Sequence, residues 1–307
     1  MSNKQFYVST FYLFKPIEDL NSTQERIESW GESKRIKGLF ILASEGINST
    51  FSAPSKEALN SAEKFFKTLF NSQNIDFKHS FSEKQPFRIL KVKQRPEIVT
   101  LNTPDLVPKN KKGHHLTPTE WNNVLKNEQD ILLIDTRNWY ETHLGKFKNA
   151  VDPNIEVFTD FPKYIKEQDI PKDKKILMYC TGGIRCEKGQ LELNKMGYEN
   201  VYQLDGGILK YIEEYPNDEF DGECFVFDHR VAVDQDLQVT KKYKLCPHTG
   251  QPGTIEIICV RCDSPALLAK EIKDDPIKSI TCSKNCAYHW SARPGKKGPK
   301  QTLEFKQ

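Results

Sequence analysis

The sequence has no hydrophobic stretch long enough to cross a membrane. A spanning helix needs roughly 20 apolar residues, whereas the longest apolar runs, at 131–134 and 176–178, end within the length of a strand. The first residues alternate in polarity and show no small-residue cleavage site after an apolar block, so no secretory signal peptide is expected. We therefore expect no membrane partner and a cytoplasmic location.

A strong excess of charge is also missing. The chain has 45 Lys+Arg and 42 Asp+Glu, which gives a formal net charge of +3. Any nucleic-acid surface must then be a local basic patch. Apolar residues at 37% exclude general disorder, and 307 residues exceed the usual size of one compact core, so we expect two or three folded domains.

Motifs for common oxidative cofactors are missing as well. The sequence contains no Gly-x-Gly-x-x-Gly, no His-x-Asp/Glu pair of a facial iron triad and no haem attachment motif. A nucleotide cofactor is therefore not expected. In the absence of secretion, the eight cysteines are expected to serve catalysis or metal binding rather than disulfides.

Residues 1–95 show a periodicity that alternates between strand and helix. The predicted elements are a strand at 6–13, a helix at about 23–37, strands at 38–43 and 47–52, a helix at about 56–70, and extended segments near 76–81 and 87–93. This β-α-β-β-α-β order predicts a ferredoxin-like α+β domain. Ser55 is placed to cap its second helix. Such a domain binds RNA, docks a partner or is a structural appendage, and the fold alone does not choose among these.

The composition then shifts to Asn, Pro, Lys, Gly and His over residues 96–116, which predicts a linker. Thr117-Pro118-Thr119-Glu120 has the pattern of a capping box with proline at the first helical position, so a helix should begin there. Short apolar runs at 131–134, 176–179 and 201–204 are typical of parallel strands buried on both faces. We predict an α/β parallel-sheet domain at 117–222 and a small cysteine-rich region at 223–307.

A cysteine lies where the second of these apolar runs ends. Backbone amides of the following turn, the dipole of the next helix and the Arg185 guanidinium would all favour an anion on sulfur, which should lower the pKa of Cys180. We interpret Cys180 as the catalytic residue. Its active-site loop comprises Thr181, Gly182, Gly183, Ile184 and Arg185.

The spacing of this loop argues against a cysteine phosphatase. Phosphatases need a Cys-x5-Arg cradle, whereas here Arg185 comes one residue early and Cys186 occupies the required place. Cys186 is then either a thiol that resolves an oxidised Cys180 or a buried structural thiol.

The loop instead resembles that of rhodanese domains. Further similarity lies in segments 135–141, 145–150 and 204–208. In that family the loop cysteine carries sulfur as a persulfide, so the resemblance implies the same use of Cys180. It also implies that Asp135 and Arg137 form a structural salt bridge that holds the first loop of the domain.

The order of the parts resembles a narrower family. A ferredoxin-like domain containing Ser44-Glu45-Gly46-Ile47-Asn48, a rhodanese domain, the segment 226–233 and a cysteine-rich tail are together similar to the bacterial rhodanese-domain tRNA uridine-34 hydroxylases. The resemblance covers roughly the whole chain and departs at Ser49, where glycine is expected. It implies an oxidoreductase that forms 5-hydroxyuridine at the wobble position, with tRNA as partner and molecular oxygen as co-substrate.

Two functions remain open at this point. In the first, Cys180 adds as thiolate or persulfide to C6 of the flipped uracil, which makes C5 electron-rich enough to react with an oxygen species. In the second, the protein is a persulfide or thiosulfate sulfurtransferase that acts on a protein or small-molecule acceptor. A scaffold without catalysis is not expected, because the Cys-x4-Arg loop is intact.

The tail contains two close cysteine pairs. Their separation approximates tetrathiolate zinc spacing, although the second pair is one residue wider than ideal. We predict a structural zinc, with Cys246 and His248 as spare ligands; the alternative is a set of reduced thiols without metal. The predicted ligands are Cys259, Cys262, Cys282 and Cys286.

Basic residues gather in the linker and near the C-terminus. They are either RNA-binding residues or simply solvated charges. Tyr288 and Trp290 either stack on a base or pack around the metal. The RNA-binding candidates are Lys109, Lys111, Lys112, Arg293, Lys296 and Lys297.

Overall fold

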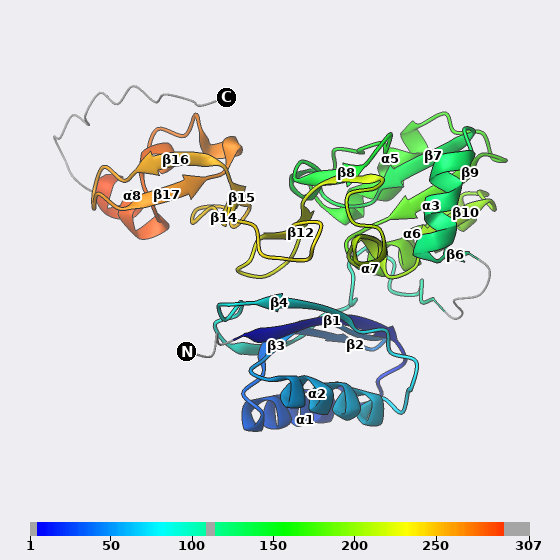
Figure 1. Ribbon diagram of the computed structural model, residues 1–307, viewed down its shortest axis with the longest axis horizontal. Coiled ribbons are helices and arrows are strands. Elements are labelled where there is room, and N and C mark those ends of the chain that lie inside the picture. Colours follow the sequence, from blue (N-terminus) through cyan, green and yellow to red (C-terminus); the bar gives the residue numbers. More distant parts are fainter. Residues whose placement is uncertain (1–4, 109–113, 292–307) are drawn as a thin grey trace. The chain divides into compact units, whose positions relative to one another are not determined.

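The computed structural model describes residues 5–108 and 114–291 of the chain, which forms two compact units (Figure 1). The first unit contains an N-terminal domain and a parallel-sheet domain. The second unit contains most of the predicted cysteine-rich region, whose first residues belong to the first unit. The first unit comprises Met1–Asp228 with Ala232–Val239, and the second comprises His229–Val231 with Thr240–Gln307.

The N-terminal domain is a sheet of five strands covered on one face by two helices (Figure 1). Its strand order, β4-β1-β3-β2-β5, contains the 4-1-3-2 arrangement of the predicted ferredoxin-like fold, which is thereby confirmed. β5 adds an edge strand parallel to β2. The elements are β1 (Phe6–Phe14), α1 (Leu20–Ser33), β2 (Lys37–Ala43), β3 (Gly46–Ala53), α2 (Lys56–Leu69), β4 (Lys78–Ser82) and β5 (Leu90–Gln94).

The first helix begins and ends earlier than the periodicity indicates. The Asp19 carboxylate accepts a hydrogen bond from the Ser22 N–H at 2.9 Å, which starts α1 at residue 20. Arg35 has a φ of 56°, and the Ile36 N–H donates to the Gly31 carbonyl, so the helix has ended by this point. The prediction of a helix at 23–37 was therefore wrong at both ends.

Ser55 and Ser49 are two further positions that the sequence singled out in this domain. Ser55 caps α2 as predicted, because its hydroxyl accepts from the Ala58 N–H at 3.2 Å. Ser49, where the sequence departs from the expected glycine, lies inside β3 opposite Phe11 and Phe40. The departure from glycine therefore lies in mid-strand and not in a turn.

The second domain of the first unit has a four-stranded parallel sheet of order β6-β10-β9-β7, as the apolar runs predict. Thr117 and Glu120 form the predicted capping box at the start of α3. The strands and helices of the domain are β6 (His115–Leu116), α3 (Pro118–Asn127), β7 (Ile131–Asp135), α4 (Trp139–Thr142), β8 (Gly145–Phe147), η1 (Phe158–Asp160), α5 (Phe161–Glu167), β9 (Lys175–Tyr179), α6 (Ile184–Lys195), β10 (Val201–Leu204), α7 (Gly207–Glu214), β11 (Phe220–Gly222), β12 (Cys224–Phe225) and β13 (Ala232–Val233).

The end of the predicted linker belongs to this sheet. β6 pairs with β10 in parallel, with His115 opposite Gln203. The segment before it is also packed, since Leu101 and Leu106 are buried in a cluster with residues of the parallel-sheet domain. Composition alone therefore did not reveal that Leu101, Leu106 and the strand at 115–116 make contacts with residues distant in sequence.

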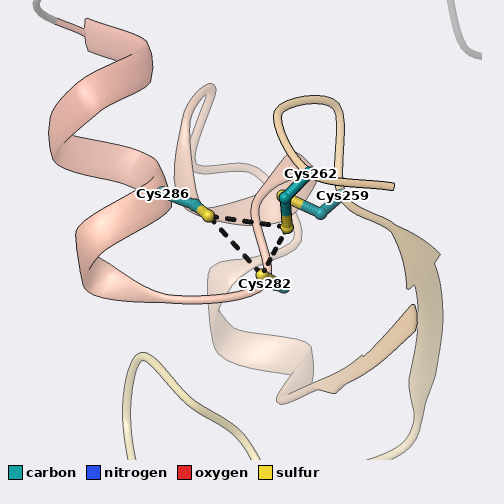
Figure 2. A group of neighbouring side chains, drawn as sticks. All are labelled: Cys259, Cys262, Cys282 and Cys286. Atoms are coloured by element: carbon teal, nitrogen blue, oxygen red, sulfur yellow. Dashed lines mark hydrogen bonds between the residues drawn. The ribbon is translucent and has the colours of Figure 1, made fainter. Parts of the chain in front are cut away.

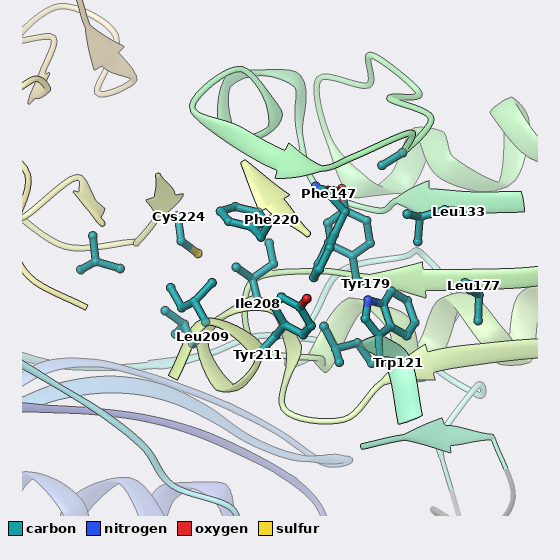
Figure 3. Close-up of a cluster of buried hydrophobic side chains, with 14 of the residues drawn as sticks. Trp121, Leu133, Phe147, Leu177, Tyr179, Ile208, Leu209, Tyr211, Phe220 and Cys224 are labelled. Atoms are coloured by element: carbon teal, nitrogen blue, oxygen red, sulfur yellow. Dashed lines mark hydrogen bonds between the residues drawn. The ribbon is translucent and has the colours of Figure 1, made fainter. Parts of the chain in front are cut away.

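Alternate residues of β9 point into separate cores. Leu177 and Tyr179 pack with Trp121, Phe147 and other large side chains on one face (Figure 3). On the other face, Ile176 and Met178 join a cluster that also contains Cys180 and Cys186. The apolar run is thus buried on both faces, and the strand that precedes Cys180 is packed on each side.

The second unit is built from short elements around a small core. This core contains Cys246, Ile257, Leu268, Ala269 and Ile272. None of the helices within 5–108 and 114–291 has the length and apolarity needed to cross a membrane. The elements are β14 (Lys244–Leu245), β15 (Pro252–Gly253), β16 (Ile255–Ile258), β17 (Pro265–Leu268), η2 (Lys270–Ile272), η3 (Lys278–Ile280) and α8 (Lys284–Ser291).

A buried lysine joins the two domains of the first unit. Lys188 of α6 is 0% exposed, and its Nζ lies 2.8 Å from a Glu45 oxygen and 2.6 Å from a Glu97 oxygen. Each carboxylate also accepts from the backbone, Glu45 from the Ile98 N–H at 2.7 Å and Glu97 from the Asn102 N–H at 2.9 Å. One ammonium group is therefore shared by the N-terminal domain and the segment that leads out of it.

We expect Lys188→Met to lower the free energy of unfolding by about 3–5 kcal/mol, because it leaves two buried carboxylates without a counterion. Urea unfolding of the full chain measures the loss. Lys195→Met on the same helix is the matched control, since Lys195 is exposed and lies 3.9 Å from Glu192; its change should stay within about 0.5 kcal/mol. Equal losses in the two variants would contradict a special role for the buried ammonium.

Candidate functional site

Cys180 lies directly after β9, in a turn that leads into α6. Gly183 adopts a φ of +99°, which glycine accommodates readily, and its N–H donates to the Cys180 Sγ at 3.0 Å. The Ile208 N–H at the start of α7 donates to the Cys180 carbonyl at 3.0 Å. A Cβ on Gly207 would lie 2.6 Å from that carbonyl, so the close approach of α7 requires glycine there.

The surroundings of the Cys180 sulfur stabilise a thiolate. Burial, which leaves only 1% of the residue exposed, acts to raise the pKa of the thiol. The hydrogen bond from Cys186, the positive charge of Arg185 and the backbone N–H groups of Arg185 and Gly182 outweigh it and lower the pKa of Cys180 to about 6. Much of this sulfur is therefore ionised at neutral pH.

A buried carboxylate fixes the arginine that supplies this charge. Glu141 of α4 accepts from the Arg185 guanidinium at 2.7 Å and from the Asn138 N–H at 3.1 Å. Glu141 is 0% exposed, so its orientation is set by these donors. The salt bridge expected between Asp135 and Arg137 is present as well, with two paired contacts of 2.7 and 2.9 Å, and both side chains are buried.

The structure brings Cys186 next to Cys180. Cys186 lies in the first turn of α6 and is fully buried, with its sulfur 3.6 Å from the Thr136 hydroxyl oxygen. Burial and the hydrogen bond with Cys180 raise the pKa of Cys186 well above its ordinary value. The pair therefore combines one ionised sulfur with one that keeps its proton.

Three residues near the loop, none of which the sequence singled out for this site, share one hydrogen-bonded contact. Tyr12 of β1 donates its hydroxyl hydrogen to Glu187 at 2.7 Å, and His115 has a ring nitrogen 3.2 Å from the same oxygen. A charged residue in the first turn of a buried helix was the available signal for Glu187. No local pattern indicated Tyr12, which is 175 positions away.

The second unit brings together the predicted metal ligands (Figure 2). Cys259 and Cys262 lie between β16 and β17, while Cys282 and Cys286 lie just before and on α8. The four sulfurs are all within 4.8 Å of one another. Sulfur–sulfur distances of 3.4 Å from Cys262 to Cys282 and 3.7 Å from Cys286 to each of these two show separate thiols rather than disulfides.

This arrangement fits a tetrahedral metal ion. A Zn–S bond of about 2.3 Å places the sulfurs of a tetrahedral site about 3.8 Å apart, close to the separations observed. The cysteine cluster could therefore hold a metal ion. The proposed spare ligands are not part of it: Cys246 is buried in the small core, and the His248 Nε2 lies 2.6 Å from the Thr281 carbonyl.

The predicted RNA-binding residues cannot be placed, because they lie outside the described residues. Among the aromatic candidates, Tyr288 of α8 is 69% exposed and Trp290 is partly exposed. The residues outside the described ranges are Lys109, Lys111, Lys112, Arg293, Lys296 and Lys297.

Two family models match the chain. One, described as a UPF0176 acylphosphatase like domain, matches residues 6–98, and the other, a rhodanese-like domain, matches residues 117–214. They correspond to the two domains of the first unit.

Curated proteins match over most of the chain. A tRNA uridine(34) hydroxylase from Bdellovibrio bacteriovorus is 55% identical over 300 residues, covering 98% of this chain and 86% of the relative. Proteins of the same name from Picosynechococcus and Legionella pneumophila (strain Corby) are 44% and 42% identical. These alignments cover 81% and 78% of this chain, and 84% and 97% of the relatives.

The surroundings of Cys180 predict an alkylation profile that separates it from ordinary thiols. Because the pKa of Cys180 is lowered to about 6, its reaction with iodoacetamide should reach half of its maximal rate near pH 6 and level off above it. Peptide-resolved mass spectrometry is needed, so that Cys180 is read separately from the other seven cysteines of the chain.

Arg185→Gln is the matched variant for this measurement. It removes the positive charge beside the sulfur, so the midpoint for Cys180 should move up. A wild-type midpoint for Cys180 near the ordinary thiol pKa of about 8.5 would contradict the thiolate interpretation.

Proposed function

The chain belongs to the family of tRNA uridine(34) hydroxylases, and we propose that it hydroxylates the wobble uridine of tRNA to 5-hydroxyuridine in an oxygen-dependent reaction. The observation that carries this proposal is the 55% identity to a named tRNA uridine(34) hydroxylase over 98% of the chain. The buried thiolate site supports it, because it supplies a nucleophile within the rhodanese-like domain. We place the reaction in the cytoplasm.

Cys180 is the catalytic residue in this proposal. Its thiolate adds to C6 of the flipped uracil, which moves electron density onto C5. C5 then forms a bond to oxygen, the C5 proton is lost, and elimination of the thiolate restores the ring. Molecular oxygen is the co-substrate; one of its atoms is retained, and reduction of the other to water takes two protons and two electrons from an external reductant.

The groups around Cys180 have distinct roles in keeping its sulfur ionised and in place. The loop amides and Arg185 stabilise the thiolate, and Glu141 keeps Arg185 in place. Cys186, which retains its proton, donates a hydrogen bond to Cys180 and is close enough to resolve it after oxidation. We propose that tRNA phosphates contact the two basic segments. Those segments contain Lys109, Lys111, Lys112, Arg293, Lys296 and Lys297.

A sulfurtransferase remains the second candidate. The observation that favours it is the rhodanese-like loop itself, since the same amides and charge would stabilise a persulfide on Cys180. In that case the acceptor would be a protein or a small molecule rather than a tRNA base. Both candidates use Cys180, so the product formed distinguishes them.

Cys180→Ser should abolish 5-hydroxyuridine, because a serine hydroxyl stays protonated at neutral pH. The expected loss of activity is on the order of 1,000-fold or more. Mass spectrometry of tRNA nucleosides from a deletion strain that expresses the variant measures it. Cys224→Ala is the matched control: Cys224 is also buried, but burial raises its pKa to about 12, so modification should persist.

The product decides between the two functions. If Cys180→Ser still forms 5-hydroxyuridine, the thiol mechanism is wrong. If wild-type protein transfers sulfane sulfur to cyanide and the deletion strain keeps its normal level of 5-hydroxyuridine, the sulfurtransferase is the better assignment.

We propose that the cysteine cluster of the second unit holds a structural zinc. Four thiolates saturate a tetrahedral ion, which leaves no position for a substrate. The small core of this unit supports the proposal, because a bound metal can supply the stability that a short segment lacks.

Protein purified without chelator should contain about one zinc per chain, and Cys259→Ser should lose it. Elemental analysis measures the metal, and limited proteolysis measures the loosening of the second unit. Cys246→Ala is the control, because Cys246 is a buried cysteine of the same unit outside the cluster and its substitution should leave zinc bound. A metal-free wild-type protein with a protease-resistant tail would contradict the proposal.

A further inference from the structure

The active-site loop is in contact with the N-terminal domain of the same unit. A Cβ built on Gly183 would lie 3.1 Å from the Tyr12 hydroxyl, and one built on Gly182 would lie 3.9 Å from the Thr10 methyl group. Both Thr10 and Tyr12 belong to β1, where alternate residues face the same side of the sheet. The side of β1 that carries these residues therefore lies against the loop that carries Cys180.

The contact includes a buried, charge-assisted hydrogen bond. The Tyr12 hydroxyl donates to Glu187 Oε1 at 2.7 Å, and Glu187 is only 4% exposed. His115 Nε2 lies 3.2 Å from the same oxygen. Glu187 directly follows Cys186 in the first turn of α6. A hydrogen bond to the Glu187 carboxylate therefore also helps to fix this turn, which follows the Cys180 loop.

Tyr12 is suited to act as a permanent donor. Burial, followed by the negative charge of Glu187, raises the pKa of the phenol well above its ordinary value, so the hydroxyl keeps its proton throughout the physiological range. The Lys78 ammonium lies over the ring, 5.0 Å from its centroid. The donor is thus held both through its hydroxyl group and through its ring.

We propose that Tyr12 is a positioning residue of the active site, which acts through Glu187 to hold the first turn of α6 and the Cys180 loop in their reactive geometry. The inference rests on the proposed function, since it assumes that the Cys180 thiolate is the reacting group. It gives the N-terminal domain a defined task, because the loop of the rhodanese-like domain is completed by a side chain from outside that domain.

The physical reason is the cost of removing one donor from a buried carboxylate, which would keep His115 at 3.2 Å but lose its shorter hydrogen bond of 2.7 Å. Without the Tyr12 hydroxyl, Glu187 must move towards another donor or accept water. Either change shifts the first turn of α6 and misaligns the Gly183 N–H that lies 3.0 Å from the Cys180 sulfur. A weaker N–H···S contact makes the thiolate less stable.

Several titratable groups surround the contact between Tyr12 and Glu187. Changes at Tyr12 act on Cys180 through geometry rather than through charge, since phenol and phenyl side chains are both neutral at the relevant pH. Within the described residues these groups include Glu187, His115, Lys78, Asp76, Cys180, Cys186, Arg185, Glu141, Tyr140 and Cys224.

Tyr12→Phe in the full chain tests the proposal, with the pH dependence of Cys180 alkylation as the readout. The midpoint should rise by about one pH unit, which corresponds to a roughly tenfold smaller thiolate fraction below the midpoint. The kcat for tRNA hydroxylation should fall by a similar factor, while KM for tRNA changes little. Tyr7→Phe makes the same chemical change on the same strand, outside this contact, and should leave both readouts unmoved.

A double-mutant cycle locates the effect at the Glu187 contact. In a Glu187→Ala background the acceptor is absent, so Tyr12→Phe should shift the midpoint no further. An unmoved midpoint in the single variant, even with lower thermal stability, overturns the proposal, as does an equal shift with and without Glu187. Alkylation is read without tRNA, so a Cys180→Ser protein that still hydroxylates tRNA would overturn the proposed function and leave the alkylation result standing.

Discussion

The architecture of the first unit depends on one buried ammonium group. Lys188 has no access to water, so its charge is stable only while both Glu45 and Glu97 stay in place. Glu45 lies in the turn between β2 and β3, and a Cβ on the following Gly46 would come within 2.0 Å of the Leu13 carbonyl. Glu45 is thus required by its ion pair with Lys188, and Gly46 is required by the close approach of the Leu13 carbonyl.

The first turn of α6 connects most of the features described above. Successive residues of a helix point in directions about 100° apart, so four in a row reach four different surroundings. One fixes the charge near the sulfur, one donates to the sulfur, and two reach the N-terminal domain. The contacts run from Arg185 to Glu141, from Cys186 to Cys180, from Glu187 to Tyr12 and from Lys188 to Glu45.

The sequence predicts what depends on local pattern. Apolar runs and a capping box were sufficient for the parallel sheet, and the Cys-Thr-Gly-Gly-Ile-Arg spacing was sufficient to single out the loop. Cysteine spacing also indicated which sulfurs lie together, as the geometry of Cys259 and its three neighbours shows. The strand at His115 and the roles of Tyr12 and Lys188 could not be predicted, because each depends on partners far away in the chain.

The shared ammonium has a consequence for the order of folding. During synthesis the N-terminal domain leaves the ribosome first, with Glu45 and Glu97 still hydrated because Lys188 has not yet been made. Their burial becomes favourable only after α6 has formed and brought its ammonium group to them. Docking of the two domains is therefore a late step, and the loop that carries Cys180 is completed in the same step.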